Sequence, residues 1–212
     1  MARIDDYRQA RELSRKGLSK KDSDLVARLS GAAVIEDNRD LRAISISFLG
    51  RELVISWPDM DFAYKDSDEE VPIQQQVLLL HYLDGASSSG GTALTGEWIS
   101  FQDVPDGRFY MDAFIKRAKD PLLKTFGDNP GKMPRLASKA YDASSMDLGD
   151  FSVIVRALPL VPVALILWEG DEEFPPDGNI LFDKSIYKIL SAEDIAWLAG
   201  MVVYPLMGMA KK

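Results

Sequence analysis

Residues Phe151–Asp183 read FSVIVRALPLVPVALILWEGDEEFPPDGNILFD, and this stretch decides the fold. Its first part, Phe151–Leu158, is rich in β-branched residues that alternate with others, which suits a pleated strand. Its second part, Val161–Trp168, is apolar almost throughout, which is typical of a strand covered on both faces. Pro159 and Pro162 bound the connection because proline restricts its own backbone and the residue before it. The stretch therefore predicts an antiparallel hairpin at the centre of a sheet.

A second hairpin is predicted nearer the N-terminus. Arg42–Phe48 alternates in polarity, Glu52–Trp57 places its apolar residues on one face, and Gly50 lies at the turn between them. We expect one sheet that includes both Arg42–Trp57 and Phe151–Trp168.

Helical spacing of apolar residues marks three further stretches. They are Ile4–Arg15, Gln74–Leu83 and the segment that follows Ser191. Asp84–Gly85 is expected to end the second helix, and Ser191 with Asp194 resembles a capping box that begins the third. These elements predict an α+β fold, a single domain over 1–212 with a mainly antiparallel sheet flanked by helices. Residues 1–31 form its N-terminal helical segment.

Composition excludes several classes of site. The chain has 212 residues, a formal net charge of −8 and no cysteine. Disulfides, zinc–thiolate sites and cysteine nucleophiles are therefore excluded within it, and nucleic acid is an unfavourable partner. The start MARIDDYRQA lacks the apolar core of a signal peptide, and no apolar run reaches about 20 residues. We expect a cytoplasmic protein with neither nucleic-acid nor membrane partners.

Four acidic residues follow the central apolar strand: Glu169, Asp171, Glu172 and Glu173. Carboxylates placed just after a buried strand are suited to lining a pocket. Here they are candidate ligands for a divalent cation such as Mg²⁺ or Ca²⁺, or an acid and base pair. The competing interpretation is a solvated turn, which is the usual place of such charges.

His81 is the single histidine of the chain and follows three leucines on the predicted helix. A neutral imidazole can ligate a metal, occupy the axial position of a tetrapyrrole such as a corrinoid or haem, or act as a base. The competing interpretation is a histidine packed in the core with one satisfied hydrogen bond. We take His81, Tyr82 and Trp168 as the candidate ligand contacts, and the sequence indicates no catalytic residue.

A series of motifs carries a resemblance over most of the chain. In order they are LLLHYL, TGEWISFQDVPDGRFYMDAF, PLLKTFG, GDFSVIVRALPLVPVALILWEGDEEFP, ILFDKSI and LSAEDIAWLAG. They resemble the family of domain of unknown function 3786 in anaerobic bacteria and archaea, most densely over residues 76–203. The resemblance brings no established activity. It implies a setting in anaerobic one-carbon or corrinoid metabolism. It also implies a separate iron–sulfur protein as partner, because some relatives carry a cysteine-rich iron–sulfur segment that this chain lacks.

Three classes of function remain open after these observations. The first is an accessory module that binds a small molecule, with a corrinoid or another tetrapyrrole near His81. The second is a metal-dependent hydrolase that uses the acidic cluster at 169–173. The third is a protein-interaction domain. We expect the first, and whether the protein is an enzyme stays open at this point.

Overall fold

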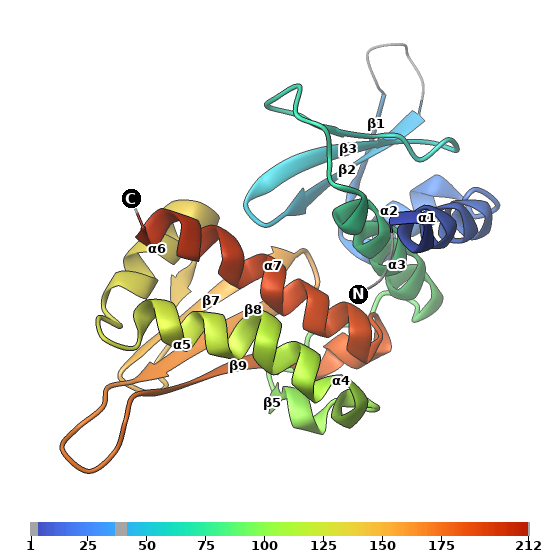
Figure 1. The fold of residues 1–212 in the computed structure, drawn as a ribbon. Coiled ribbons are helices and arrows are strands. Elements are labelled where there is room, and N and C mark those ends of the chain that lie inside the picture. Colours follow the sequence, from blue (N-terminus) through green and yellow to red (C-terminus); the bar gives the residue numbers. More distant parts are fainter. Residues whose placement is uncertain (1–3, 37–41, 212) are drawn as a thin grey trace. The chain divides into compact units, whose positions relative to one another are not determined.

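The computed structural model describes residues 4–36 and 42–211. Contacts between Cα atoms divide the chain into two compact units. Unit 1 consists of Met1–Ala93 with Lys188–Leu190, and unit 2 consists of Leu94–Tyr187 with Ser191–Lys212. Each unit contains helices and an antiparallel sheet of its own (Figure 1), which confirms the α+β class. The expectation of a single domain over 1–212 stays a prediction.

Unit 1 joins a four-stranded sheet to three helices. The strands are β1 (Ala33–Glu36), β2 (Arg42–Phe48), β3 (Arg51–Ser56) and β4 (Phe62–Tyr64), and the helices are α1 (Ile4–Leu18), α2 (Ser23–Ser30) and α3 (Ile73–Ser88). The sheet order is β1-β2-β3-β4, and every pair is antiparallel. The predicted β2–β3 hairpin is confirmed, with Leu49 and Gly50 at φ of 50° and 75°. Two successive positive φ angles are typical of a type I′ hairpin turn.

Helix α3 is longer than the sequence predicts, because it continues through Asp84–Gly85 to Ser88. The reason is a tertiary contact of Gly85. A Cβ atom placed on Gly85 would lie 1.9 Å from the carbonyl oxygen of Ile189, so glycine is needed here for a close backbone approach and not for ending the helix. The last turn of α3 is held by Lys21, whose Nζ lies 2.8 Å from the Asp84 carboxylate and 2.9 Å from Ser87 Oγ. A cation at this end also suits the helix dipole.

Unit 2 is built on a five-stranded sheet. Its strands are β5 (Trp98–Ser100), β6 (Ser144–Ser145), β7 (Phe151–Leu158), β8 (Val161–Trp168) and β9 (Asp177–Asp183). Its α-helices are α4 (Gly107–Phe114), α5 (Asp120–Phe126), α6 (Lys132–Tyr141) and α7 (Ala192–Ala210). The unit also contains a π-helical turn, η2 (Ile115–Lys119), and two 3₁₀ turns, η1 (Phe101–Asp103) and η3 (Lys184–Lys188). The sheet order is β5-β9-β8-β7-β6. The predicted β7–β8 hairpin is confirmed, and β8 is the central strand.

The expectation that both hairpins share one sheet is wrong. Strands β2 and β3 pair only with strands of unit 1, and β7 and β8 only with strands of unit 2, among the strands that the structure describes. The alternation of polar and apolar residues indicates which face of a strand is buried, but it does not specify the neighbouring strand.

Helix α7 organises the helical layer of unit 2. It contacts α4, η2, α5, α6 and β7, and it lies beside α5 over the sheet (Figure 1). The predicted capping box is confirmed, since the Ser191 side chain accepts from Asp194 N–H and the Asp194 carboxylate accepts from the Ser191 backbone. No helix within 4–36 and 42–211 has both the length and the apolar character to cross a bilayer.

A buried carboxylate fixes the start of β5 against the end of β9. Asp183 is 3% exposed and accepts hydrogen bonds from the backbone N–H groups of Thr95, Gly96 and Ser185, at 3.1, 2.7 and 2.9 Å. Its Oδ1 also accepts from the hydroxyls of Thr95 and Ser185. Burial alone would raise the pKa of Asp183, but the hydrogen bonds from Ser185, Thr95 and Gly96 outweigh it and lower the pKa to about 2. The carboxylate is therefore ionised and fully bonded at neutral pH.

Candidate functional site

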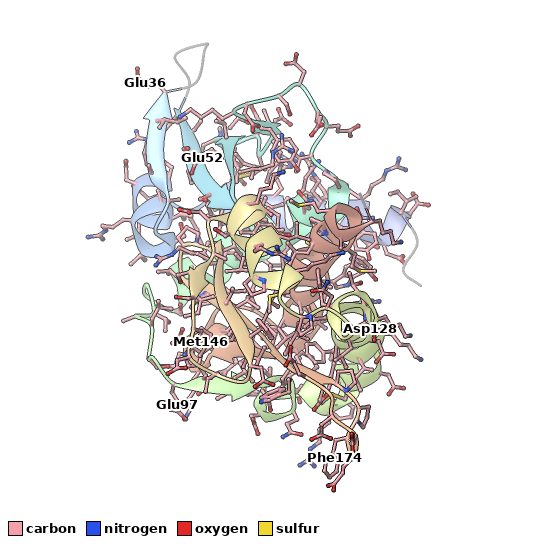
Figure 2. All side chains as sticks on the ribbon, turned by 90° about the vertical axis from the view of Figure 1, so that its left-hand side faces the viewer. Glu36, Glu52, Glu97, Asp128, Met146 and Phe174 are labelled. Carbon is pink, nitrogen blue, oxygen red and sulfur yellow. The ribbon has the colours of Figure 1, made fainter. Side chains whose placement is uncertain are left out.

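The loop between β8 and β9 contains the predicted acidic segment. It projects from unit 2 with Phe174, whose residue surface is 67% exposed, near its tip (Figure 2). Asp171 gives the loop its shape, because its Oδ1 accepts from the backbone N–H groups of Glu173 and Phe174, both at 2.8 Å. These two hydrogen bonds lower the pKa of the Asp171 carboxyl, and the bond from Phe174 N–H has the larger effect. The carboxylate is thus ionised at neutral pH and held in one orientation.

The loop between α5 and α6 faces this segment. Pro176, at the end of the β8–β9 loop, packs against both loops, since a Cβ atom on Gly127 would lie 3.3 Å from Pro176 Cγ and one on Gly170 would lie 2.7 Å from Pro176 Cδ. The neighbouring Glu169 N–H donates to the Asp150 carboxylate at 2.8 Å. The two loops therefore meet in close packing at Pro176, and the hydrogen bond to Asp150 holds the start of the β8–β9 loop.

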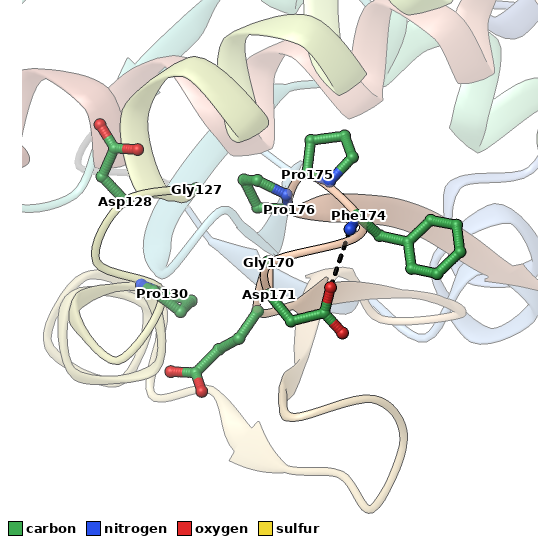
Figure 3. A pocket seen from close by; sticks show the side chains of 9 residues that line it. Gly127, Asp128, Pro130, Gly170, Asp171, Phe174, Pro175 and Pro176 are labelled. Carbon is green, nitrogen blue, oxygen red and sulfur yellow. Dashed lines mark hydrogen bonds between the residues drawn. The ribbon is translucent and has the colours of Figure 1, made fainter.

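A pocket of about 360 Å³ opens between the two loops (Figure 3). Its lining consists of Gly127, Asp128, Pro130, Glu169, Gly170, Asp171, Phe174, Pro175 and Pro176. Three of these side chains are carboxylates, and they come from different places in the sequence. Figure 3 shows Asp128 on one loop and Asp171 on the other, with the Phe174 ring directed away from Asp128 at the rim. The volume is within the range of about 300–1,000 Å³ that small-molecule sites occupy.

The three carboxylates of this pocket, Asp128, Glu169 and Asp171, have no ion-pair partner among the described residues. In the same unit, by contrast, Asp177 pairs with Lys119 and Asp120 pairs with Lys124. Unpaired carboxylates around one cavity create a negative potential that attracts cations.

Comparison with known proteins places the chain in one family. The family described as domain of unknown function (DUF3786) matches residues 22–204, which is most of the chain. The chain belongs to the DUF3786 family. No curated protein and no solved structure matches this DUF3786 chain. The match therefore confirms the family that the motifs indicated, whereas its setting in anaerobic organisms stays a prediction.

The structure separates the four acidic residues predicted as one cluster. Glu169 and Asp171 line the pocket of this DUF3786 protein, whereas Glu172 and Glu173 are exposed and belong to the part of the loop outside it. Within the described residues, no group of three or more His, Asp or Glu side chains is arranged to hold a metal ion. The divalent-cation site at 169–173 stays a prediction.

The three predicted ligand contacts do not gather in one described pocket. Tyr82 has no exposed surface, and its hydroxyl donates to the Ser30 carbonyl at 2.6 Å, so in this conformation it packs and bonds within unit 1. His81 is half-buried on the same helix and has an interaction partner. Trp168 belongs to unit 2, where it ends β8 opposite Asp177 and is 39% exposed. A role of His81 in ligand binding stays a prediction.

Asp128 is the one carboxylate of the pocket that the sequence did not indicate. It lies in the run Gly127–Gly131, GDNPG, whose composition is typical of a turn between two helices. Only the packing of Pro176 against Gly127 shows that this turn meets the acidic loop some 40 positions later. No local pattern contains that information, because the juxtaposition depends on how α5 and β9 pack.

Proposed function

We propose that this protein binds a small organic cation in the acidic pocket of unit 2. The observation that carries the proposal is the set of three unpaired carboxylates, Asp128, Glu169 and Asp171, around a cavity of about 360 Å³. An amine held there gains charge-assisted hydrogen bonds, which are shorter and stronger than neutral ones. Pro130, Pro175 and Pro176 supply apolar surface for the uncharged part of such a ligand.

An organic cation fits this pocket better than a metal ion does. Mg²⁺ and Ca²⁺ require several oxygen atoms within about 2.0–2.6 Å of one point. The carboxylates line the pocket without forming a group of that kind among the described residues. An amine with a carbon skeleton can span the distance between them. For the same reason, small-molecule binding is favoured over metal-dependent hydrolysis at 169–173.

The binding proposal is tested with two probes that differ in one charged group, phenylethylamine and 2-phenylethanol. Calorimetric titration should detect the amine and not the alcohol, because the carboxylates supply most of the attraction. Replacing Glu169 with Gln should weaken amine binding about tenfold, which corresponds to one lost charge-assisted contact of about 1.4 kcal/mol.

Glu172 provides the matched control for this experiment. Glu172→Gln removes the same charge from the same exposed loop but from a side chain that does not line the pocket, so amine binding should be unchanged. Mg²⁺ serves as a further comparison and should not displace the amine at equal concentration. Equal weakening by Glu169→Gln and Glu172→Gln would show a general effect of charge and would contradict a site in the pocket.

The resemblance to a family of anaerobic bacteria and archaea supports a second, more specific hypothesis: a role in anaerobic metabolism in which the protein binds a corrinoid or another tetrapyrrole. His81 is the residue that motivates it, since a half-buried imidazole is a suitable axial ligand. We expect hydroxocobalamin or haem to show a shifted absorption spectrum with the wild type and an unshifted one with His81→Ala. Identical spectra for both proteins would leave His81 with a purely structural role.

A further inference from the structure

A second pocket of unit 2, of about 380 Å³, lies between α6 and the last turn of α7. We call it the α6 pocket; its lining residues are Lys132, Arg135, Leu136, Lys139, Met209 and Ala210. The three basic residues stand at positions i, i+3 and i+7 of α6, so they lie along one face of that helix. None of the residues of the acidic pocket lines it.

Within residues 4–36 and 42–211, the basic side chains of the α6 pocket have no acidic partners. Helix α6 has the sequence KMPRLASKAY and contains no Asp or Glu, whereas α1 and α5 pair their cations within the helix, as in Arg15–Glu12 and Lys124–Asp120. Across the part of the chain that the structure describes, Lys132, Arg135 and Lys139 form no ion pair, and Arg135 donates only its Nε–H to the Gly131 carbonyl. Three unpaired cations on one helix are notable in a chain of net charge −8.

The α6 pocket has apolar lining residues, and the two helices that carry them are joined by a hydrogen bond. Leu136 and Met209 are half-buried there, and the aliphatic stems of lysine and arginine add apolar surface below their charged ends. The methionine side chain adapts to irregular apolar partners. Tyr141, on the buried side of α6, donates its hydroxyl to the Val202 carbonyl at 2.8 Å and so fastens α6 to α7. The pocket thus combines fixed walls with an adaptable apolar surface.

We propose that the α6 pocket binds a small amphipathic anion. Its carboxylate or phosphate head interacts with Lys132, Arg135 and Lys139, and its aliphatic part lies on Leu136 and Met209. The guanidinium of Arg135 suits such a head because it offers two parallel donors to two oxygen atoms. A purely apolar ligand would leave the three cations unpaired, and a bare anion would leave the apolar floor uncovered.

The proposal is tested by calorimetric titration with octyl phosphate below its micellar concentration, inorganic phosphate and octyl glucoside. Octyl phosphate should bind at least about tenfold more tightly than inorganic phosphate, because part of its chain leaves water on binding. Octyl glucoside, which has the same chain without the charge, should not bind measurably. Equal binding of both phosphates, or of octyl phosphate and octyl glucoside, would overturn the proposal.

Charge reversal at one position locates the site. Arg135→Glu should weaken octyl phosphate binding at least about tenfold, whereas Lys116→Glu, an exposed residue of η2 with the same change in net charge, should leave it unchanged. If Arg135→Glu does not fold, the double variant Lys132→Gln with Lys139→Gln replaces it, with the same loss expected. Unchanged binding in a folded variant, or binding to anionic phosphatidylglycerol vesicles but not to the monomeric phosphate, would contradict a small-molecule site.

Discussion

Replacement of Gly85 by alanine should destabilise the protein by about 3 kcal/mol or more, because the new methyl group cannot be accommodated. Its ideal position is 1.9 Å from the Ile189 carbonyl oxygen and 2.8 Å from the Ile189 carbonyl carbon. Both neighbours are backbone atoms, so relief requires α3 and the Lys188–Leu190 segment of unit 1 to move apart. Urea denaturation of the variant should show a correspondingly lower midpoint.

Gly17 provides the control for this substitution. It lies inside helix α1, where an added Cβ atom would meet nothing within 4 Å. Gly17→Ala should therefore stabilise the protein by roughly 0.5–1 kcal/mol through the better helix propensity of alanine. A Gly85→Ala variant as stable as the wild type would show that the close approach of α3 to Ile189 does not exist in solution.

Replacement of Asp183 by asparagine should cost about 3 kcal/mol, although the two side chains have nearly the same shape. The carboxylate accepts from the backbone donors of Thr95, Gly96 and Ser185. An amide presents an NH₂ group to at least one of these donors, and that donor is then left buried without an acceptor. Glu97→Gln is the control, since it removes a carboxylate from the exposed Glu97–Lys184 pair and should change stability by less than about 1 kcal/mol.

The same carboxylate should make stability depend on acidity. The folded-state pKa of Asp183, about 2, lies below its ordinary value of 3.8. The stabilisation is therefore complete above about pH 4 and is lost as the pH falls towards 2, and it amounts to roughly 2 kcal/mol. Urea midpoints measured between pH 2 and 6 should fall more steeply for the wild type than for Asp183→Asn. Parallel pH profiles of the two proteins would disprove this assignment.

Local chemistry accounts for the parts of the fold that the sequence predicted. The β2–β3 and β7–β8 hairpins follow from alternation and turn residues, and the start of α7 follows from the Ser191–Asp194 capping box. The errors lie where tertiary structure overrides a local signal. Gly85 is typical of a helix end, but it serves a backbone contact with a segment about 100 residues away in sequence. Likewise, period-2 patterns did not show that the two hairpins belong to different sheets.

The acidic pocket was also predicted only in part from the sequence. The sequence located its β8–β9 loop, because carboxylates directly after an apolar strand are a strong local signal. It did not separate Glu169 and Asp171 from Glu172 and Glu173, since the direction of each side chain depends on the turn that Asp171 forms with Glu173 and Phe174. It missed the α6 pocket for a different reason. Its basic residues become conspicuous only when the ion pairs of the other helices are known.

Residues Lys188–Leu190 belong to unit 1, although they are synthesised long after the rest of that unit. A ribosome completes Ala93 long before it adds these residues, because it must first synthesise residues 94–187. At roughly 5–20 residues per second, the delay is on the order of 5–20 s. During that interval the backbone of Ile189 is not yet present to pack against Gly85 of α3. Unit 1 therefore reaches its final packing only after residues 188–190 have emerged from the ribosome, and a nascent chain stalled before position 188 lacks this contact.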